Sequence, residues 1–246
     1  MYETIEFRMD TVPLHIPIVF LAVVITTFGF LIYAVKVASP GKKDFTPTVV
    51  ATFLVILLFV NALFAFSGFL ADYQAMPPRL PVILGIQTLC LVLLFFRKSV
   101  REFVRRMPIT TLTHIHIIRV PVEIVLWWLY KESVIDPILT FEGNNYDIII
   151  GISGPFAGLF LVGMRSKSQF GAIVWNIAGI VLLINIVYMA ISCTPYPIQS
   201  MCFETPNTFV FEFPYVWLPT FVVPAVLFCH LASLYKLFTT KDSNYN

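Results

Sequence analysis

The sequence predicts an all-α integral membrane protein, a polytopic bundle of about seven transmembrane helices. Hydrophobic residues make up 58% of the 246 residues and charged residues only 12%, and the mean hydropathy is +0.85. Soluble domains carry about 25% charged residues, so this chain has half the usual charge. No stretch between its apolar runs is long enough to bury a separate soluble core. We therefore expect one transmembrane domain over residues 1–246.

The apolar residues gather into long runs, each close to the 17–25 residues that a helix needs to cross hydrocarbon. The runs are continuously apolar and do not alternate as the strands of a membrane barrel do. A helix also satisfies its own backbone hydrogen bonds in lipid, so each run is predicted to be a helix. The predicted spans are residues 17–35, 49–70, 80–96, 112–130, 148–164, 170–191 and 215–235.

The basic residues predict the orientation of the chain. Lysine and arginine collect in the cytoplasmic loops of membrane proteins, and here they follow the first, third, fifth and seventh spans. The opposite side carries Arg8, Arg79 and Lys131 alone. We therefore expect the N-terminus outside and the C-terminus in the cytoplasm. The basic residues assigned to the cytoplasmic side are Lys36, Lys42, Lys43, Arg97, Lys98, Arg101, Arg105, Arg106, Arg165, Lys167, Lys236 and Lys241.

The start of the chain has the wrong charge for a cleavable signal peptide. Residues 1–15 contain Glu3, Glu6 and Asp10 against Arg8, whereas a signal peptide begins with a basic segment. We expect the first span to remain as a membrane helix. The formal net charge of +2 is distributed by topology, so nothing indicates a nucleic-acid partner.

The fourth span carries the most polar face. His116, Arg119, Glu123 and Trp127 follow one another at steps of three, four and four, which places them on one side of a helix. Ionised groups in a membrane are costly and usually functional. Two interpretations remain open: Arg119 and Glu123 neutralise each other as a structural pair, or they belong to a ligand, ion or proton site. Arginine before glutamate is the weaker order for a helical pair, which favours other partners for one of them.

Two further residues are expected at a similar depth. Counted from the ends of their spans, Asn176 on the sixth and His230 on the seventh fall in the same inner layer as His116. If the fourth, sixth and seventh helices are neighbours, these residues line one polar pocket. Two histidines at one depth could bind a metal ion or a haem. Buried neutral imidazoles are the simpler interpretation, so no cofactor and no metal site is predicted.

The predicted outer loops contain a second candidate site and a cysteine pair. Glu142, Asn145 and Asp147 precede the fifth span, and Asp147 is placed to cap that helix. Glu142 and Asn145 have no such local role, which indicates an outer ligand or cation site. Cys193 and Cys202 share the last outer loop and could form a disulfide in an oxidising compartment.

Familiar catalytic motifs are missing, so the sequence favours a protein that is not an enzyme. It contains no Walker motif, HExxH motif, nucleophile elbow or CxxCH, and the seventh span has no central lysine for a retinal Schiff base. The favoured function is a carrier or channel for a small molecule or ion. The alternatives are a ligand-sensing or partner-binding membrane subunit, and an intramembrane enzyme that acts on a lipid or quinone through His116, Glu123 and His230.

Three stretches resemble an uncharacterised group of bacterial multi-pass membrane proteins, with similarity over roughly residues 110–235. They are Arg119-Val-Pro-Val-Glu123, Phe141-Glu-Gly-Asn-Asn-Tyr-Asp147, and the segment from Phe213 through Trp217 to His230. The resemblance implies a multi-pass protein of a bacterial inner membrane and brings no function with it. The expected partners are the lipid bilayer and a membrane-protein partner or a second copy of the chain.

Overall fold

The computed structural model describes residues 12–39, 46–163 and 168–239, and within these ranges the regular secondary structure is entirely helical. The main helices are α1 (His15–Ala38), α2 (Pro47–Phe66), α3 (Arg79–Leu94), α4 (Lys98–Arg106), α5 (Ile109–His114), α6 (Arg119–Lys131), α7 (Asp147–Phe160), α8 (Gln169–Ser192) and α9 (Val223–Thr239). The short helical turns are Phe69–Ala71, Ile115–Ile118, Pro137–Leu139, Phe209–Phe211 and Leu218–Val222. Some residues used in the sequence predictions lie outside the described ranges: Glu3, Glu6, Arg8, Asp10, Lys42, Lys43, Met164, Arg165, Lys167 and Lys241.

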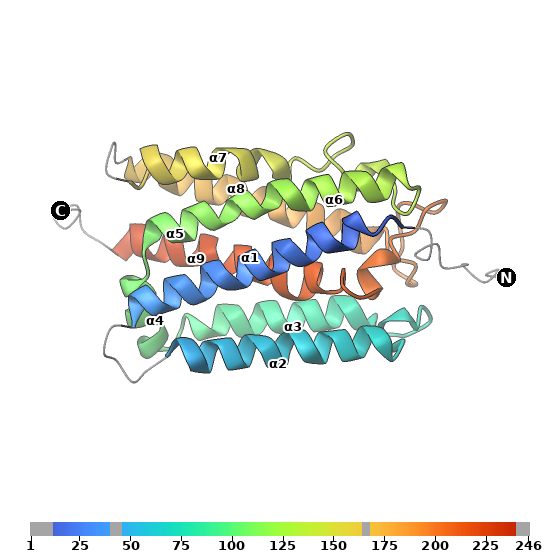
Figure 1. The fold of residues 1–246 in the computed structure, drawn as a ribbon, viewed down its shortest axis with the longest axis horizontal. Coiled ribbons are helices and arrows are strands. Elements are labelled where there is room, and N and C mark those ends of the chain that lie inside the picture. Colours follow the sequence, from blue (N-terminus) through green and yellow to red (C-terminus); the bar gives the residue numbers. More distant parts are fainter. Residues whose placement is uncertain (1–11, 40–45, 164–167, 240–246) are drawn as a thin grey trace.

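The long helices run side by side along the longest axis of the molecule, and the chain reverses direction between successive passes (Figure 1). Within the described ranges, five helical stretches are long and apolar enough to cross a bilayer: 15–38, 47–66, 109–131, 169–192 and 218–239. The pair α3 and α4 would make a sixth, but these helices meet at 84°. Helix α7 is apolar but shorter, with 14 residues. The prediction of an all-helical chain with several long apolar helices is therefore confirmed, whereas the count of seven spans stays a prediction.

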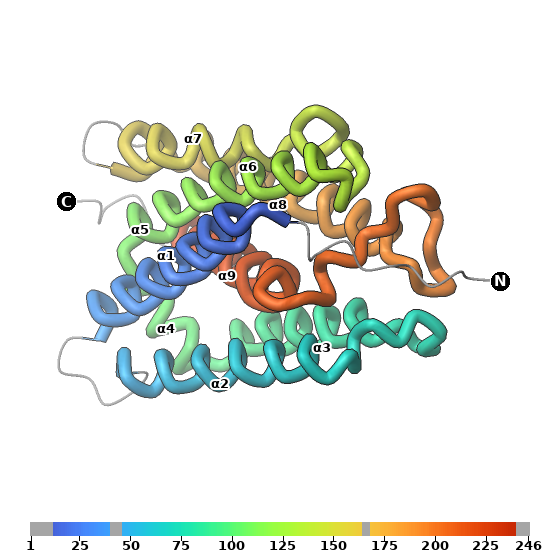
Figure 2. The backbone as a smooth tube through the Cα atoms, turned by 45° about the vertical axis from the view of Figure 1, so that its right-hand side comes forward, coloured from blue at the N-terminus to red at the C-terminus, as the bar shows by residue number. Residues whose placement is uncertain are grey.

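The helices at the centre of the bundle differ from those at its edge. In the stretch 109–131, 56% of an 18-residue apolar segment is buried within the protein, against 17% of such a segment in α2. Helix α9 packs on α3, α4, α5 and α8, while α6 packs on α1 and α7. In the turned view of Figure 2, α2 and α3 lie together along one side of the bundle. The two most buried stretches, 109–131 and 218–239, carry His116, Arg119, Glu123 and His230, so the fold positions these polar residues in its interior.

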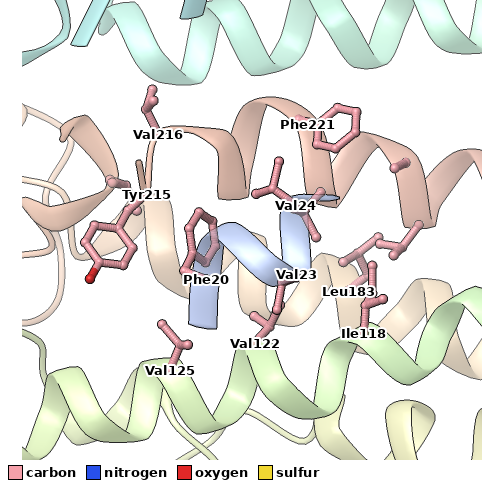
Figure 3. Packing of buried hydrophobic residues seen from close by; sticks show 14 of the residues in the cluster. Phe20, Val23, Val24, Ile118, Val122, Val125, Leu183, Tyr215, Val216 and Phe221 are labelled. Atoms are coloured by element: carbon pink, nitrogen blue, oxygen red, sulfur yellow. The ribbon is translucent and has the colours of Figure 1, made fainter. Parts of the chain in front are cut away.

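The core beside the polar residues is apolar and aromatic. Phe20 and Val23 of α1 lie against the α6 face that carries Val122 and Val125 (Figure 3). The rings of Phe20 and Tyr215 have their centroids 5.2 Å apart. These residues are almost fully buried, and this packing holds α6 at a fixed rotation about its axis.

The peripheral helices are tied to the last long loop by hydrogen bonds. Tyr196 donates its hydroxyl to the carbonyl of Leu70 at 2.6 Å and accepts from the amide of Leu80 at 3.4 Å. The indole of Trp217 donates to the carbonyl of Leu58 in α2 at 2.8 Å. These bonds connect α2 and α3 to the loop that follows α8, which forms one end of the cavity described below.

Candidate functional site

The helical stretch that bears the predicted polar face is not a uniform α-helix. Between α5 and α6, residues Ile115–Ile118 form a turn of 3-10 helix that continues directly into Arg119. Side chains three residues apart nearly eclipse each other in a 3-10 helix, whereas in an α-helix they are offset. This local winding helps to align His116 with Arg119, and both side chains reach the same histidine of α9.

Arg119 is the centre of a buried cluster. Its Nη1 donates to Asp147 Oδ1 of α7 at 2.5 Å and reaches the Gly179 carbonyl of α8 at 3.5 Å. Its Nη2 lies 2.9 Å from His230 Nε2 of α9. The Arg119 side chain is 3% exposed and that of Asp147 9%. One guanidinium therefore joins three helices that are distant in the sequence.

The hydrogen bonds assign the tautomer of His230. Because a guanidinium only donates, His230 Nε2 accepts from Arg119, and the ring proton resides on Nδ1. Nδ1 then donates to Asn176 Oδ1 at 2.9 Å, and Asn176 Nδ2 donates to the Ala172 carbonyl at 2.8 Å. His230 is thus a neutral imidazole with both nitrogens engaged. The structure brings together Asn176 and His230, which the sequence placed at one depth.

His116 stacks on His230, with ring centroids 3.9 Å apart and planes 22° from parallel. Trp175 packs its ring edge-on against His116, with centroids 5.3 Å apart. Neither ring nitrogen of the buried His116 has a hydrogen-bond partner among the described residues. The two histidines lie face to face, and both ring nitrogens of His230 are already engaged by Arg119 and Asn176. Across the described ranges no group of three or more His, Cys, Asp or Glu residues is arranged to hold a metal ion.

Small residues make room for this packing. A Cβ atom at Gly154 of α7 would lie 3.4 Å from the Cβ of His116. At Gly179 of α8 a Cβ atom would overlap the ring of His230. The backbones of α7 and α8 therefore lie in close contact with the two histidines. Pro155 does not interrupt α7, which is continuous over Asp147–Phe160.

Glu123 does not pair with Arg119, so the interpretation of these two residues as a mutual ion pair is wrong. Glu123 Oε1 accepts from Asn145 Nδ2 at 2.5 Å, and Asn145 also donates to the Leu139 carbonyl at 3.1 Å. Arg119 instead pairs with Asp147, the first residue of α7, two positions after Asn145. The other carboxylate oxygen, Glu123 Oε2, is buried and has no partner within the described part of the chain.

Asp147 does not cap α7 as the sequence suggested. The helix begins at Asp147 itself, after Tyr146, and the Asp147 carboxylate is bound to Arg119. Its backbone amide is satisfied by Asn145 Oδ1 at 3.1 Å. A carboxylate in the first turn of a helix is also favoured by the helix dipole. Asp147 and Asn145 thus belong to the buried cluster and not to an outer loop site.

Glu142 remains apart from the buried cluster. It accepts from the Trp127 indole at 2.7 Å and pairs with Lys131 at 3.1 Å, and the Lys131 and Glu142 side chains are 45% and 40% exposed. These two donors, first the indole and then the ammonium, hold the pKa of Glu142 below its usual value. The predicted outer group of Glu142, Asn145 and Asp147 is therefore divided between the surface and the interior.

A cavity of about 80 Å³ lies next to the buried cluster. The end next to the buried cluster, called the deep end below, is lined by Arg119, Glu123 and Asp147. The other end is lined by Thr194 and Asn207 of the loop after α8. The apolar walls come from α3, α6, α8, α9 and the turns Phe209–Phe211 and Leu218–Val222: Leu80, Pro81, Leu84, Val122, Leu126, Leu183, Ile186, Val187, Ala190, Ile191, Val210, Leu218, Pro219, Val222, Val223 and Val226.

The loop at the far end of the cavity is closed by a disulfide between Cys193 and Cys202, whose Cα atoms are 4.9 Å apart. Asn207 donates from its backbone amide to the Cys193 carbonyl at 2.8 Å and from Nδ2 to the Ala190 carbonyl at 3.0 Å. Its Oδ1 is buried without a partner in the described ranges. Sequence analysis missed Asn207, because an asparagine between proline and threonine in a loop is an ordinary turn residue.

The chain belongs to a family described as a domain of unknown function, DUF8737, whose family model matches residues 77–238. This range contains α3 to α8 and all of α9 except its last residue, with the buried cluster and the whole lining of the cavity. The stretches that resembled an uncharacterised group of proteins lie within it. No curated protein and no solved structure matches the chain.

Proposed function

We propose that this chain is an integral membrane protein of seven crossings, with its N-terminus outside, that carries a small molecule or ion through the cavity beside Glu123. The five long apolar helices support the membrane location. Helices α3 and α7 run alongside them (Figure 1), although 14 residues of α7 span only about 21 Å, less than the hydrocarbon core of about 30 Å. A bacterial inner membrane is the expected location.

The basic residues in the described ranges support this orientation. Arg106 of α4 donates to the Ala38 carbonyl at the end of α1 at 3.0 Å, and Lys236 of α9 donates to the Arg105 carbonyl at 2.5 Å. The ends of α1 and α9 and the whole of α4 therefore meet at one end of the bundle. Lys36, Lys98 and Arg101 belong to the same elements, as the positive-inside rule requires of a cytoplasmic end.

The observation that carries the proposal is the Glu123 carboxylate at the deep end of the cavity. A buried acceptor without a partner costs about 1–3 kcal/mol, and more if it is charged. In a purely structural core, an apolar side chain of similar size would avoid this cost. A ligand or proton that reaches Glu123 through the cavity would satisfy it, as is typical of ionisable residues inside membranes.

Two helical stretches beside the cavity contain irregular turns. The 3-10 turn Ile115–Ile118 precedes Arg119, and Leu218–Val222 form a π-helical turn that lines the cavity. Such turns occur often at functional sites, and interrupted helices line the substrate sites of many transporters. The enzyme alternative is less well supported, since His116 and His230 are not among the residues that line the cavity.

Substrate-driven flux in proteoliposomes tests the proposal. The purified chain would be challenged with gradients of small inorganic cations, amines, carboxylates and neutral solutes. We expect at least one of these to cross only in the presence of the protein, and Glu123→Gln to abolish that flux. The exposed Glu132 provides the matched control, because Glu132→Gln makes the same chemical change outside the cavity and should leave flux unchanged. Equal flux through both variants contradicts the proposal.

A further inference from the structure

The deep end of the cavity holds more negative than positive charge. Arg119, Glu123 and Asp147 line it together, and Arg119 forms its ion pair with Asp147. His230 is neutral by its hydrogen bonds, and no carboxylate contacts the buried ring nitrogens of His116 among the described residues. Glu123 is therefore a second carboxylate without a countercharge. In a membrane interior such a carboxylate either holds a proton or pairs with a cation that comes from outside the chain.

The unsatisfied groups of the cavity also favour a cation that donates hydrogen bonds. Glu123 Oε2 at one end and Asn207 Oδ1 at the other are both acceptors, and the described residues offer a donor to neither. Arg119 Nε is an unpaired donor in the same ranges. An anion bound there would lie beside two carboxylates, so the charge distribution disfavours it.

The cavity has a shape that suits a chain with a polar head. Gly179, which contacts Arg119, and Ala190, which contacts Asn207, are both on α8. At about 1.5 Å per residue, these two points on the helix are about 16 Å apart along its axis. Between them the walls are apolar. A volume of about 80 Å³ is several times the roughly 10–15 Å³ that a single water requires.

We propose that the cavity binds a primary ammonium ion with a short alkyl chain, and that this ion exchanges with a proton on Glu123. The inference rests on the proposed function for the location of the binding site. The protonated carboxylic acid of Glu123 loses its proton to solvent as the ammonium enters. The resulting carboxylate accepts N–H bonds from the ammonium, and the alkyl chain lies along the apolar wall. Charge balances, because one cation enters as one proton leaves.

The pH dependence of this exchange involves few other groups. From α7 Asp147 faces the deep end, and from α9 His230 and Cys229 lie near Arg119. The residues that α3 and α8 contribute to the cavity are apolar. The titratable residues of α1 in the described ranges are distant or exposed: His15 packs on Trp128, and Tyr33 and Lys36 are exposed.

Calorimetry of the full chain in lipid nanodiscs tests this inference, with n-butylammonium chloride as the probe and 1-butanol and sodium butyrate as matched controls. Titrations in two buffers of different ionisation enthalpy count the protons released. We expect about one proton released per ammonium bound, and a dissociation constant that falls about tenfold per pH unit while unliganded Glu123 remains protonated. Binding without proton release would overturn the exchange.

Variants locate the site. Glu123→Gln keeps the acceptor for Asn145 but cannot form a carboxylate, and should weaken ammonium binding at least about 100-fold, whereas Glu132→Gln should not. If Glu123→Gln fails to fold, Ala190→Phe fills the outer part of the cavity without touching a charge and should also abolish binding. Full binding by either cavity variant overturns the inference.

The outcomes separate this inference from the proposed function. Binding of butanol or butyrate without binding of butylammonium overturns the ligand class, and a carrier for another solute still stands. Proton-coupled binding of butylammonium without flux of any probe in proteoliposomes supports the site and contradicts the carrier.

Discussion

Helix α6 makes two ion pairs with the segment that precedes and begins α7, and the environments of the two pairs are opposite. The side chains of Arg119 and Asp147 are buried, at 3% and 9% exposed. Lys131 lies about three turns further along α6 than Arg119, and its side chain and that of its partner Glu142 are 45% and 40% exposed. The surface pair exchanges contacts with water at little cost, whereas the buried pair cannot. The surface pair therefore connects α6 to the loop before α7, whereas Arg119 of the buried pair connects α6 to α7, α8 and α9.

The largest difference in the free energy of unfolding is expected between variants that remove the cation of one pair or of the other. Arg119→Met leaves Asp147 as an uncompensated buried carboxylate and should lower the free energy of unfolding by about 3–5 kcal/mol. Lys131→Met should have an effect close to the error of the measurement. Denaturation of the purified protein, followed by tryptophan fluorescence, measures both. Similar losses of stability in the two variants would show that burial does not distinguish the two pairs. The double variant Arg119→Met/Asp147→Leu should recover part of the stability lost in Arg119→Met.

Asn145 links the buried pair to Glu123. Asn145→Ala removes its bonds to the Glu123 carboxylate, the Leu139 carbonyl and the Asp147 amide. We expect a loss of about 2–3 kcal/mol in the same assay, because three buried hydrogen bonds are lost together. The neighbouring Asn144 is exposed, and Asn144→Ala should have little effect. If the two variants lose the same stability, the loop does not bind the cluster as described.

The close packing around His230 is tested by the addition of one methyl group. Gly179→Ala would force the α8 backbone and the His230 ring apart and should cost about 1–3 kcal/mol. Gly85 in α3 has open space at the corresponding position, so Gly85→Ala should be neutral or stabilise by up to about 1 kcal/mol. Thermal unfolding of both variants makes the comparison. A neutral Gly179→Ala would show that the interior is less tightly packed than its contacts imply.

The surface pair should show the smallest effect, visible as a pH dependence. The pKa of Glu142 is lowered in the folded protein, so its contribution is complete above its unfolded pKa of about 4.5 and is lost as the pH falls through the lower folded pKa. Trp127 donates to this carboxylate, and its fluorescence should change in that acidic range. The change should disappear in Glu142→Gln, and a change that persists there would belong to another group.

Sequence reasoning identified much of the buried cluster because helical spacing and depth are local properties. His116, Arg119 and Glu123 share one face by their intervals, and His230 and Asn176 were placed with them by depth along their spans. It could not pair Arg119 with Asp147, which is 28 residues away, since that choice depends on where the intervening loop returns. The same limitation hid Asn145 as the partner of Glu123.

Other features were missed because apolar runs carry no information about them. The charged stretch after the third span forms a helix, α4, bent by 84° from α3, and no hydrophobic run marked it. The 3-10 turn before Arg119 and the π-helical turn before α9 occur within apolar sequence that would equally suit a regular helix. Asn207 became visible only once the loop was folded against α8.

Helix α4 has a consequence for the lipid around the protein. It buries Val100, Phe103 and Val104, leaves Lys98, Arg105 and Arg106 exposed, and crosses the end of the bundle at a steep angle to α3. In the proposed orientation these cations lie at the level of the headgroups of the cytoplasmic leaflet. Each basic residue there gains about 1 kcal/mol from anionic phospholipid. Phosphatidylglycerol or cardiolipin should therefore collect around this end of the protein, and reconstitution should include an anionic lipid.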